Sequence, residues 1–380
     1  MAERGIGVLA CQPNVDEGDL LRKDLSFQVA KFSGFDWVRF NPDINYLGGE
    51  GPNVTVDEER WQFLDWHVER CRRNGHQILL TLAIPPSGNG WDSTFEGGEF
   101  TWSSTDQAAV IVLYRQIISR ILTQNSWPAD RLRVEIANEA SRPRYGGDPG
   151  NPGQIQVPYV FSLGAILLAL KDYFPQVKFL SHAMSFPIFT DDMANPWKTE
   201  IGWLFYAQTD VPDVLRYADI VNVHLYYDRI KYRSILTWDE YRERILKLFD
   251  DFLAEWESRG VYGTTVLQKP IWITEHGTCF NSAGMNQSLW PWANEDEVGL
   301  YRIAALDGLC QHPRADAVFL YNAMNELEEE DARDGANFGL LRFDGTYTTS
   351  YLLAANANGI TDPQIPAGSA PAADLAISGY

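Results

Sequence analysis

The chain has 380 residues, of which 45% are hydrophobic and 22% charged, and its formal net charge is −20 with a pI near 4.7. This excess of negative charge repels phosphate backbones and anionic lipids, which argues against nucleic-acid and membrane-surface partners. No apolar run reaches the roughly 18 to 20 residues that cross a bilayer.

Short apolar runs alternate with longer segments of helical periodicity along the chain. Continuous rather than alternating apolarity is typical of strands that are covered on both faces, as in parallel sheets. The strand candidates are residues 5–11, 37–40, 77–83, 132–137, 177–180, 218–225, 271–274 and 317–321. The helix candidates are residues 20–32, 57–73, 106–122, 159–173, a segment near Ile201, and residues 239–258, 296–310 and 351–356.

Eight strands alternating with eight helices predict a (β/α)8 TIM barrel. A doubly wound open sheet is the main alternative, but residues 7–15 (GVLACQPNV) lack the glycine-rich phosphate fingerprint expected after its first strand. The segments after several strands are long and rich in Gly, Pro and Trp, notably residues 85–102, 139–154 and 276–292. We therefore expect long loops on the C-terminal face, where barrel enzymes carry their active sites.

We expect one catalytic barrel over residues 1–360, followed by a Pro/Ala-rich tail or the start of a linker at residues 361–380. The six histidines form no HxH or HExxH cluster, so neither a metal nor an organic cofactor is expected. No export signal is visible, which predicts a cytoplasmic protein as written, or an extracellular one if these residues are the mature part. The oligomeric state stays unknown.

Two strand candidates, the fourth and the seventh, lead into a carboxylate at their C-terminal ends. Glu139 follows the fourth strand and Glu275 follows the seventh. In one barrel, both carboxylates would therefore project into the same cavity at the C-terminal face. A facing carboxylate pair about 5 to 5.5 Å apart is the minimum equipment for cleaving a glycosidic bond with retention. The dipeptide Asn-Glu also occurs at residues 294–295 and 325–326, and Glu326 is the main alternative to Glu139 as the acid.

Further polar residues complete a pattern at the strand ends. In chain order these residues are Arg39, Asn138, Glu139, His224, Tyr226 and Glu275. The pattern resembles that of the retaining glycoside hydrolases of clan A, which are (β/α)8 barrels such as β-mannanases, endoglucanases, β-glucosidases, β-xylosidases and β-galactosidases. The resemblance covers about residues 5–357. It implies a hydrolase of β-linked poly- or oligosaccharide that works through a covalent glycosyl-enzyme intermediate.

The resemblance also implies a role for each carboxylate. Glu275 would be the nucleophile, kept ionised by Arg39 and by a hydrogen bond from Tyr226. Glu139 would be the acid/base, holding a proton near neutral pH while its partner stays charged, so the two environments must differ.

Other residues would bind the sugar. Asn138 would donate to the sugar 2-hydroxyl, and His224 would fix the carboxylates or bind the sugar directly. Many clan A enzymes have a histidine near the end of strand three and a tryptophan platform after strand eight; this chain lacks the former, and Tyr321 or Asn322 occupies the latter position. Candidates for further stacking platforms are Trp91, Trp102, Trp197, Trp290 and Trp292.

Several other interpretations stay open at this point. Arg39 could pair only with an acid inside the barrel, such as Glu135, and His224 and Tyr226 could be packed rim residues with satisfied polar tips. At the level of function, the same carboxylate pair would also serve a transglycosylase. A barrel that binds carbohydrate without cleaving it is the non-enzymatic alternative, and a metal-dependent hydrolase is disfavoured by the histidine spacing.

Overall fold

The computed structural model covers most of the chain. It describes residues 1–8, 19–42, 47, 58–82, 93–96, 99–102, 104–138, 157–185, 213–226, 237–258, 267–277, 295–324, 339–342 and 345–366. Among these, no helix is both long enough and apolar enough to span a bilayer.

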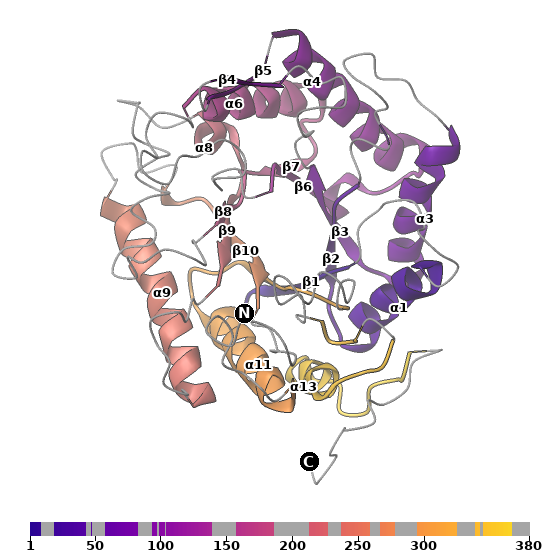
Figure 1. The fold of residues 1–380 in the computed structure, drawn as a ribbon, viewed down its shortest axis with the longest axis vertical. Coiled ribbons are helices and arrows are strands. Elements are labelled where there is room, and N and C mark those ends of the chain that lie inside the picture. The colour runs from indigo at the N-terminus through magenta and orange to yellow at the C-terminus, as the bar shows by residue number, and fades with distance from the viewer. Residues whose placement is uncertain are drawn as a thin grey trace.

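A nine-stranded sheet with parallel pairing throughout forms the centre of the molecule (Figure 1). Its strands are β1 (Glu3–Gly7), β2 (Trp37–Phe40), β3 (Gln77–Leu82), β6 (Leu132–Ile136), β7 (Lys178–Leu180), β8 (Met184–Ser185), β9 (Val221–Leu225), β10 (Ile271–His276) and β11 (Ala317–Leu320). Their spatial order is β7-β6-β3-β2-β1-β11-β10-β9-β8.

The sheet closes on itself through its fifth barrel strand, which is split into β7 and β8. The first piece pairs with β6 and the second with β9, and an isolated parallel bridge joins Leu180 to Ile220. The two edges of the sheet therefore belong to one stretch of chain. This closure gives the predicted (β/α)8 barrel rather than an open doubly wound sheet.

Helices surround the barrel as an outer ring (Figure 1). They are α1 (Asp19–Phe32), α3 (Glu58–Asn74), α4 (Ser104–Ser119), α6 (Val157–Tyr173), α8 (Asp213–Tyr217), α9 (Trp238–Ser258), α11 (Glu295–Gln311) and α13 (Thr349–Ala357). Each long helix buries an apolar stripe: in α3, Trp61, Leu64, Val68 and Cys71 recur at helical spacing and are at most 1% exposed. A π-helical turn, Arg120–Gln124, ends the α4 segment.

Most predicted elements are confirmed, with one addition. The segment after β3, expected to be an irregular loop, contains an antiparallel hairpin made of β4 (Ser93–Glu96) and β5 (Glu99–Trp102). The sequence did contain a signal for it, because two Gly residues at 97–98 separate short runs of β-branched and aromatic residues. The helix expected near Ile201 lies outside the described residues. The domain boundary at residue 360 also stays a prediction.

The barrel interior is divided into an apolar layer and a polar layer. Seven buried side chains make up the apolar layer: Trp37, Leu79, Leu180, Ile220, Trp272, Ala317 and Phe319. Because side chains on a strand repeat every two residues, the next inward positions after Trp37 and Leu79 are Arg39 and Thr81, which are also buried. Polar groups therefore begin directly above the apolar layer, toward the C-terminal ends of the strands.

Candidate active site

Arg39 on β2 binds three other side chains. Two of them lie on the strands β6 and β10, and the third comes shortly after the end of β6. Its Nη1 donates to Oε1 of Glu275 at 2.6 Å, and its Nη2 donates to Oδ1 of Asn138 at 2.9 Å. Its Nε and Nη2 also donate to the two carboxylate oxygens of Glu135, at 2.9 and 3.1 Å. The guanidinium therefore connects the second, fourth and seventh barrel strands.

Burial and charge act in opposite directions on Arg39. Burial lowers the pKa of its guanidinium, but the charges of Glu135 and Glu275 and their hydrogen bonds raise it by more, so that the net pKa lies above its usual value. The side chain is a permanent cation inside the barrel. The expectation that Arg39 contacts Glu275 is confirmed, and so is the alternative contact with Glu135, since one guanidinium binds both.

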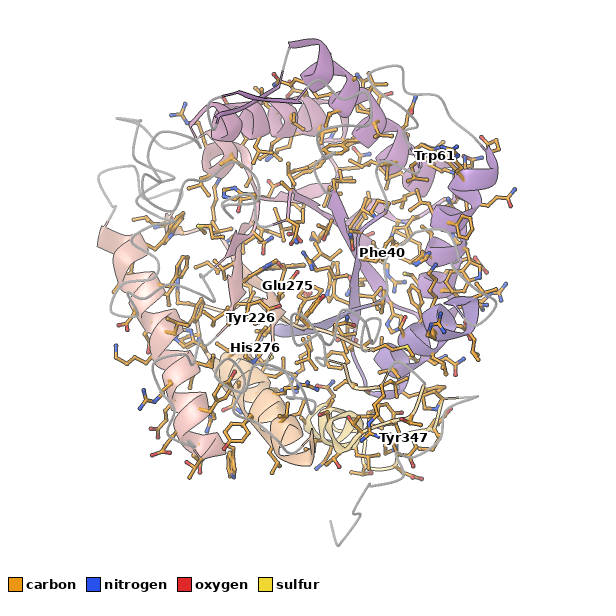
Figure 2. The ribbon with its side chains drawn as sticks, in the orientation of Figure 1. Phe40, Trp61, Tyr226, Glu275, His276 and Tyr347 are labelled. Carbon is orange, nitrogen blue, oxygen red and sulfur yellow. The ribbon has the colours of Figure 1, made fainter. Side chains whose placement is uncertain are left out.

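Glu275 lies on β10 at the C-terminal end of the barrel (Figure 2). Tyr226, directly after β9, donates its hydroxyl to Oε2 of Glu275 at 2.8 Å. Nδ1 of His224 lies 3.2 Å from the same oxygen. The register between β10 and β9 shifts between Ile273 and Glu275, and such a bulge re-aims the side chains that follow it. Both carboxylate oxygens are thus held by named donors.

His224 lies between the two carboxylates that bind Arg39. Its Nε2 is 3.9 Å from Oε1 of Glu135, while its Nδ1 faces Glu275. The side chain is fully buried. The expected contact of His224 with Glu275 is therefore present, and Tyr226 contacts the same carboxylate.

Asn138 follows the fourth barrel strand after a residue with unusual backbone geometry. Ala137 has φ +67°, in the left-handed region that costs a residue with a side chain about 1 to 2 kcal/mol. Ala137 N donates to Leu82 O at 3.0 Å, and its own carbonyl accepts from Ala183 N at 3.3 Å, so neighbouring strands hold this turn. The turn places the Asn138 amide against Arg39. Backbone strain of this kind is typically retained at functional sites.

Sequence reasoning gave Glu135 only as an alternative partner and did not identify Thr81. Glu135 is fully buried on β6, and Thr81 on β3 donates its hydroxyl to Oε2 of Glu135 at 3.0 Å. Inward alternation along β6 could have identified Glu135. A threonine within an apolar strand is too common to have identified Thr81.

Tyr321 lies directly after β11, at the same end of the barrel as Glu275. It is half-buried, its backbone N–H donates to His276 O at 2.8 Å, and its peptide bond to Asn322 is cis. Gly7 on β1 lies close to it, since a Cβ placed on Gly7 would lie 3.7 Å from the Tyr321 ring. A role for Tyr321 in binding sugar stays a prediction.

Several predicted site residues lie outside the described part of the chain. They are Glu139, Trp91, Trp290 and Trp292, together with Trp197 and the alternative acid Glu326. In the part that is described, no group of three or more His, Cys, Asp or Glu side chains is arranged to hold a metal ion.

No protein-family model matches the chain, and no curated protein matches it. Several solved structures do match it, by their fold. A family 39 glycoside hydrolase from Bacteroides cellulosilyticus WH2 has 15% sequence identity to this chain and a TM-score of 0.57, and the match covers 94% of this chain and 63% of that protein. An exo-β-1,4-mannosidase from an Opitutaceae bacterium has 14% identity, a TM-score of 0.59, and coverage of 95% and 60%.

A third structure, ZgEngAGH5_4 in complex with a cellotriose, has 14% identity and a TM-score of 0.56, with 95% of both chains covered. The chain thus spans less than two thirds of the length of the first two proteins and nearly the whole of the third. At sequence identities of 14 to 15%, the similarity shows a shared fold and nothing more. This chain therefore folds as a (β/α)8 barrel of the kind found in these glycoside hydrolases.

Proposed function

We propose that this protein is a retaining β-glycoside hydrolase that cleaves β-linked poly- or oligosaccharide by double displacement. One observation carries the proposal: a single buried guanidinium, Arg39, binds both Glu275 and Asn138. Glu139 is the next residue after Asn138 in the sequence, and we propose that it supplies the second carboxylate. Such a pair is what retaining hydrolysis requires.

Glu275 is the better nucleophile of the two carboxylates bound to Arg39. Glu135 is fully buried, whereas Glu275 retains 8% exposure and so has surface that a sugar can contact. Arg39 and Tyr226 each donate to one of its oxygens, which orients the carboxylate for attack.

Each step of the proposed reaction balances. In the first, a Glu275 oxygen bonds to the anomeric carbon, the glycosidic C–O bond breaks, and the Glu139 carboxylic acid gives its proton to the departing oxygen. In the second, the Glu139 carboxylate takes a proton from water, and the water oxygen bonds to the anomeric carbon as the ester bond to Glu275 breaks. The sum is hydrolysis with retained configuration.

The hydrogen bond between Arg39 and Asn138 supports the role proposed for Asn138. Because the amide oxygen accepts from the guanidinium, the amide N–H groups are directed elsewhere. We propose that they donate to a sugar 2-hydroxyl, a contact that strengthens as the oxocarbenium-like transition state forms.

A β-1,4-linked glucan or mannan is the first substrate class to test. Two of the structures with the same fold are a cellotriose complex and an exo-β-1,4-mannosidase. Aromatic side chains suit stacking on the C–H faces of such sugars, and we propose Tyr321, Trp91, Trp290 and Trp292 as platforms. Aryl β-glycosides and β-linked glycans, followed by sizing of the products, would identify the sugar and separate exo from endo action.

The stereochemistry of the product tests the mechanism. We expect a proton NMR time course on an active β-glycoside to show the β-anomer first, with the α-anomer appearing only through mutarotation. An α-anomer at the earliest times would reject double displacement and with it the role of Glu275 as nucleophile.

Azide rescue separates the roles of the two carboxylates. With a dinitrophenyl β-glycoside, Glu275→Ala plus azide is expected to give an α-glycosyl azide, because azide attacks once from the side that Glu275 vacates. Glu139→Ala plus azide is expected to give a β-glycosyl azide, because attack by Glu275 precedes attack by azide. The opposite pattern would exchange the two assignments.

The same assays distinguish the remaining alternatives. A transglycosylase would give longer products at high acceptor concentration in preference to hydrolysis. A binding barrel would show no turnover and unchanged calorimetric affinity in a Glu139→Ala, Glu275→Ala double variant. Activity that is unchanged by EDTA is expected, and activity lost on chelation and restored by a divalent metal would favour a metal-dependent hydrolase.

A further inference from the structure

We propose that Glu135 is a positioning residue that orients Arg39 and offsets part of its positive charge at Glu275, and so sets the pH range in which the site works. The kinetic part of this inference rests on the proposed function. Its physical part, the ionisation of Glu275, does not depend on turnover.

The orientation of Arg39 follows from its contact with Glu135. The Nε and one Nη2 N–H bind the two oxygens of the Glu135 carboxylate, which is the side-on bidentate geometry that fixes a planar guanidinium. With the plane fixed, Nη1 is directed at Glu275 and the other Nη2 N–H at Asn138. A lysine or a rotated guanidinium could not make these contacts together.

Glu135 is itself held in place by a residue on the neighbouring strand β3. Thr81 donates to its Oε2 at 3.0 Å, and its backbone lies within β6, which pairs with β3. Glu135 is fully buried, so it does not touch a substrate directly. Whatever it does for the reaction must act through Arg39 or His224.

The charge of Glu135 offsets that of Arg39. If Glu135 were neutral, Glu275 would face an uncompensated buried cation, which would hold its negative charge more tightly and weaken it as a nucleophile. Among the described residues, Arg39, Thr81 and Nε2 of His224 face Glu135, and Arg39, His224 and Tyr226 face Glu275. The two carboxylates therefore share one guanidinium and one imidazole.

The variant that removes the charge and keeps the size is Glu135→Gln. We expect the acidic and basic midpoints of its kcat/KM profile both to move to lower pH by about one unit, because the site becomes more positive. We also expect kcat to fall about 10-fold with KM little changed, since Glu135 makes no contact with substrate. A residue that only supports the fold would lower kcat or Tm and leave both midpoints in place, and that result would overturn the proposal.

Glu135→Asp separates charge from geometry. It keeps the negative charge but shortens the side chain by one methylene, so the bidentate contact with Arg39 is lost. We expect its pH midpoints to stay near those of the parent while kcat falls. Should Glu135→Gln not fold, this variant carries the test: a kcat equal to that of the parent would overturn the positioning role.

Carbon-13 NMR of glutamate-labelled protein gives a measurement that needs no turnover. The carboxyl signal of Glu275, assigned by its loss in Glu275→Gln, is expected to titrate at lower pH in Glu135→Gln than in the parent. If the parent hydrolyses nothing, the proposed function fails and this titration still decides the role of Glu135. Glu3→Gln is the matched control, because Glu3 accepts from Trp37 at the N-terminal end of the barrel, and it should leave the Glu275 titration unchanged.

Discussion

The hydroxyl of Tyr226 donates to Oε2 of Glu275 at 2.8 Å, across the boundary between adjacent barrel strands. Tyr226 comes directly after β9 and Glu275 lies on β10, and the bulge between these strands brings the two side chains together. Arg39 on β2 binds the other oxygen of the same carboxylate. The orientation of Glu275 is therefore set by two donors on separate strands.

Removing the Tyr226 hydroxyl should weaken catalysis without disturbing the fold. A hydrogen bond to a charged group contributes about 1.5 to 3 kcal/mol, so we expect Tyr226→Phe to lower kcat about 10- to 100-fold. The buried ring is retained, so Tm should change little. Tyr241→Phe is a suitable control, because Tyr241 is a buried tyrosine on α9 that packs edge-on against Tyr301. Equal losses in both variants would contradict the assigned role of Tyr226.

Two buried arginines offer a matched test of catalytic and structural ion pairs. Arg39 binds Glu135 and Glu275 inside the barrel, whereas Arg120 at the end of the α4 segment binds Asp65 and Glu58 in the helical layer. Removing one partner of a buried pair costs about 3 to 5 kcal/mol, so Arg39→Met should lower Tm. Arg120→Met should lower it less, because the Asp65 and Glu58 side chains are 30% and 67% exposed. Only Arg39→Met should also abolish turnover by the protein that remains folded. A folded, fully active Arg39→Met variant would be inconsistent with the proposed site.

Much of the fold could be predicted from the sequence because its two periodicities are clear. Continuous apolar runs such as Ile271–Thr274 indicate strands covered on both faces, and α3 shows an unbroken apolar stripe. The β4–β5 hairpin was missed because its strands are short and lie within a Gly- and Trp-rich segment. A sequence pattern of only 4 residues does not distinguish a short strand from an irregular loop.

The site could be predicted only where position along a strand is informative. Glu275 could be recognised as a carboxylate at the end of an apolar run, whereas Arg39, His224 and Tyr226 were identified by the resemblance to clan A glycoside hydrolases. The partner of Arg39 could not be chosen, since pairing across the barrel depends on which inward positions share a layer. In the structure, Arg39 binds both candidates, Glu135 and Glu275.

Three buried histidines should make the protein sensitive to acid. Burial lowers the pKa of His76, His182 and His276 to about 4, below the ordinary value of 6.5. The unfolded chain therefore binds more protons than the folded one between these values, so stability falls as pH drops from about 6.5 to about 4. Each histidine contributes a slope of about 1.4 kcal/mol per pH unit in that window.

Urea unfolding across this pH range measures the effect. We expect His76→Gln to reduce the slope of the free energy of unfolding against pH by the equivalent of one proton relative to the parent. Comparing parent and variant cancels the carboxylates that titrate in the same range. An unchanged slope between pH 6.5 and 4 would show that His76 takes up its proton equally in both states.

Two glycines on β1 test the packing of the barrel interior beneath the site. A Cβ on Gly5 would lie 2.3 Å from the Phe319 ring, which is closer than atoms can approach, whereas a Cβ on Gly7 would lie 3.7 Å from Tyr321, an ordinary contact. Overpacking costs about 1 to 3 kcal/mol, so we expect Gly5→Ala to lower Tm by several degrees and Gly7→Ala to leave it nearly unchanged. Because both glycines lie on one short strand, intrinsic strand propensity affects them alike, and similar Tm values for the two variants would mean that Phe319 can move aside at little cost.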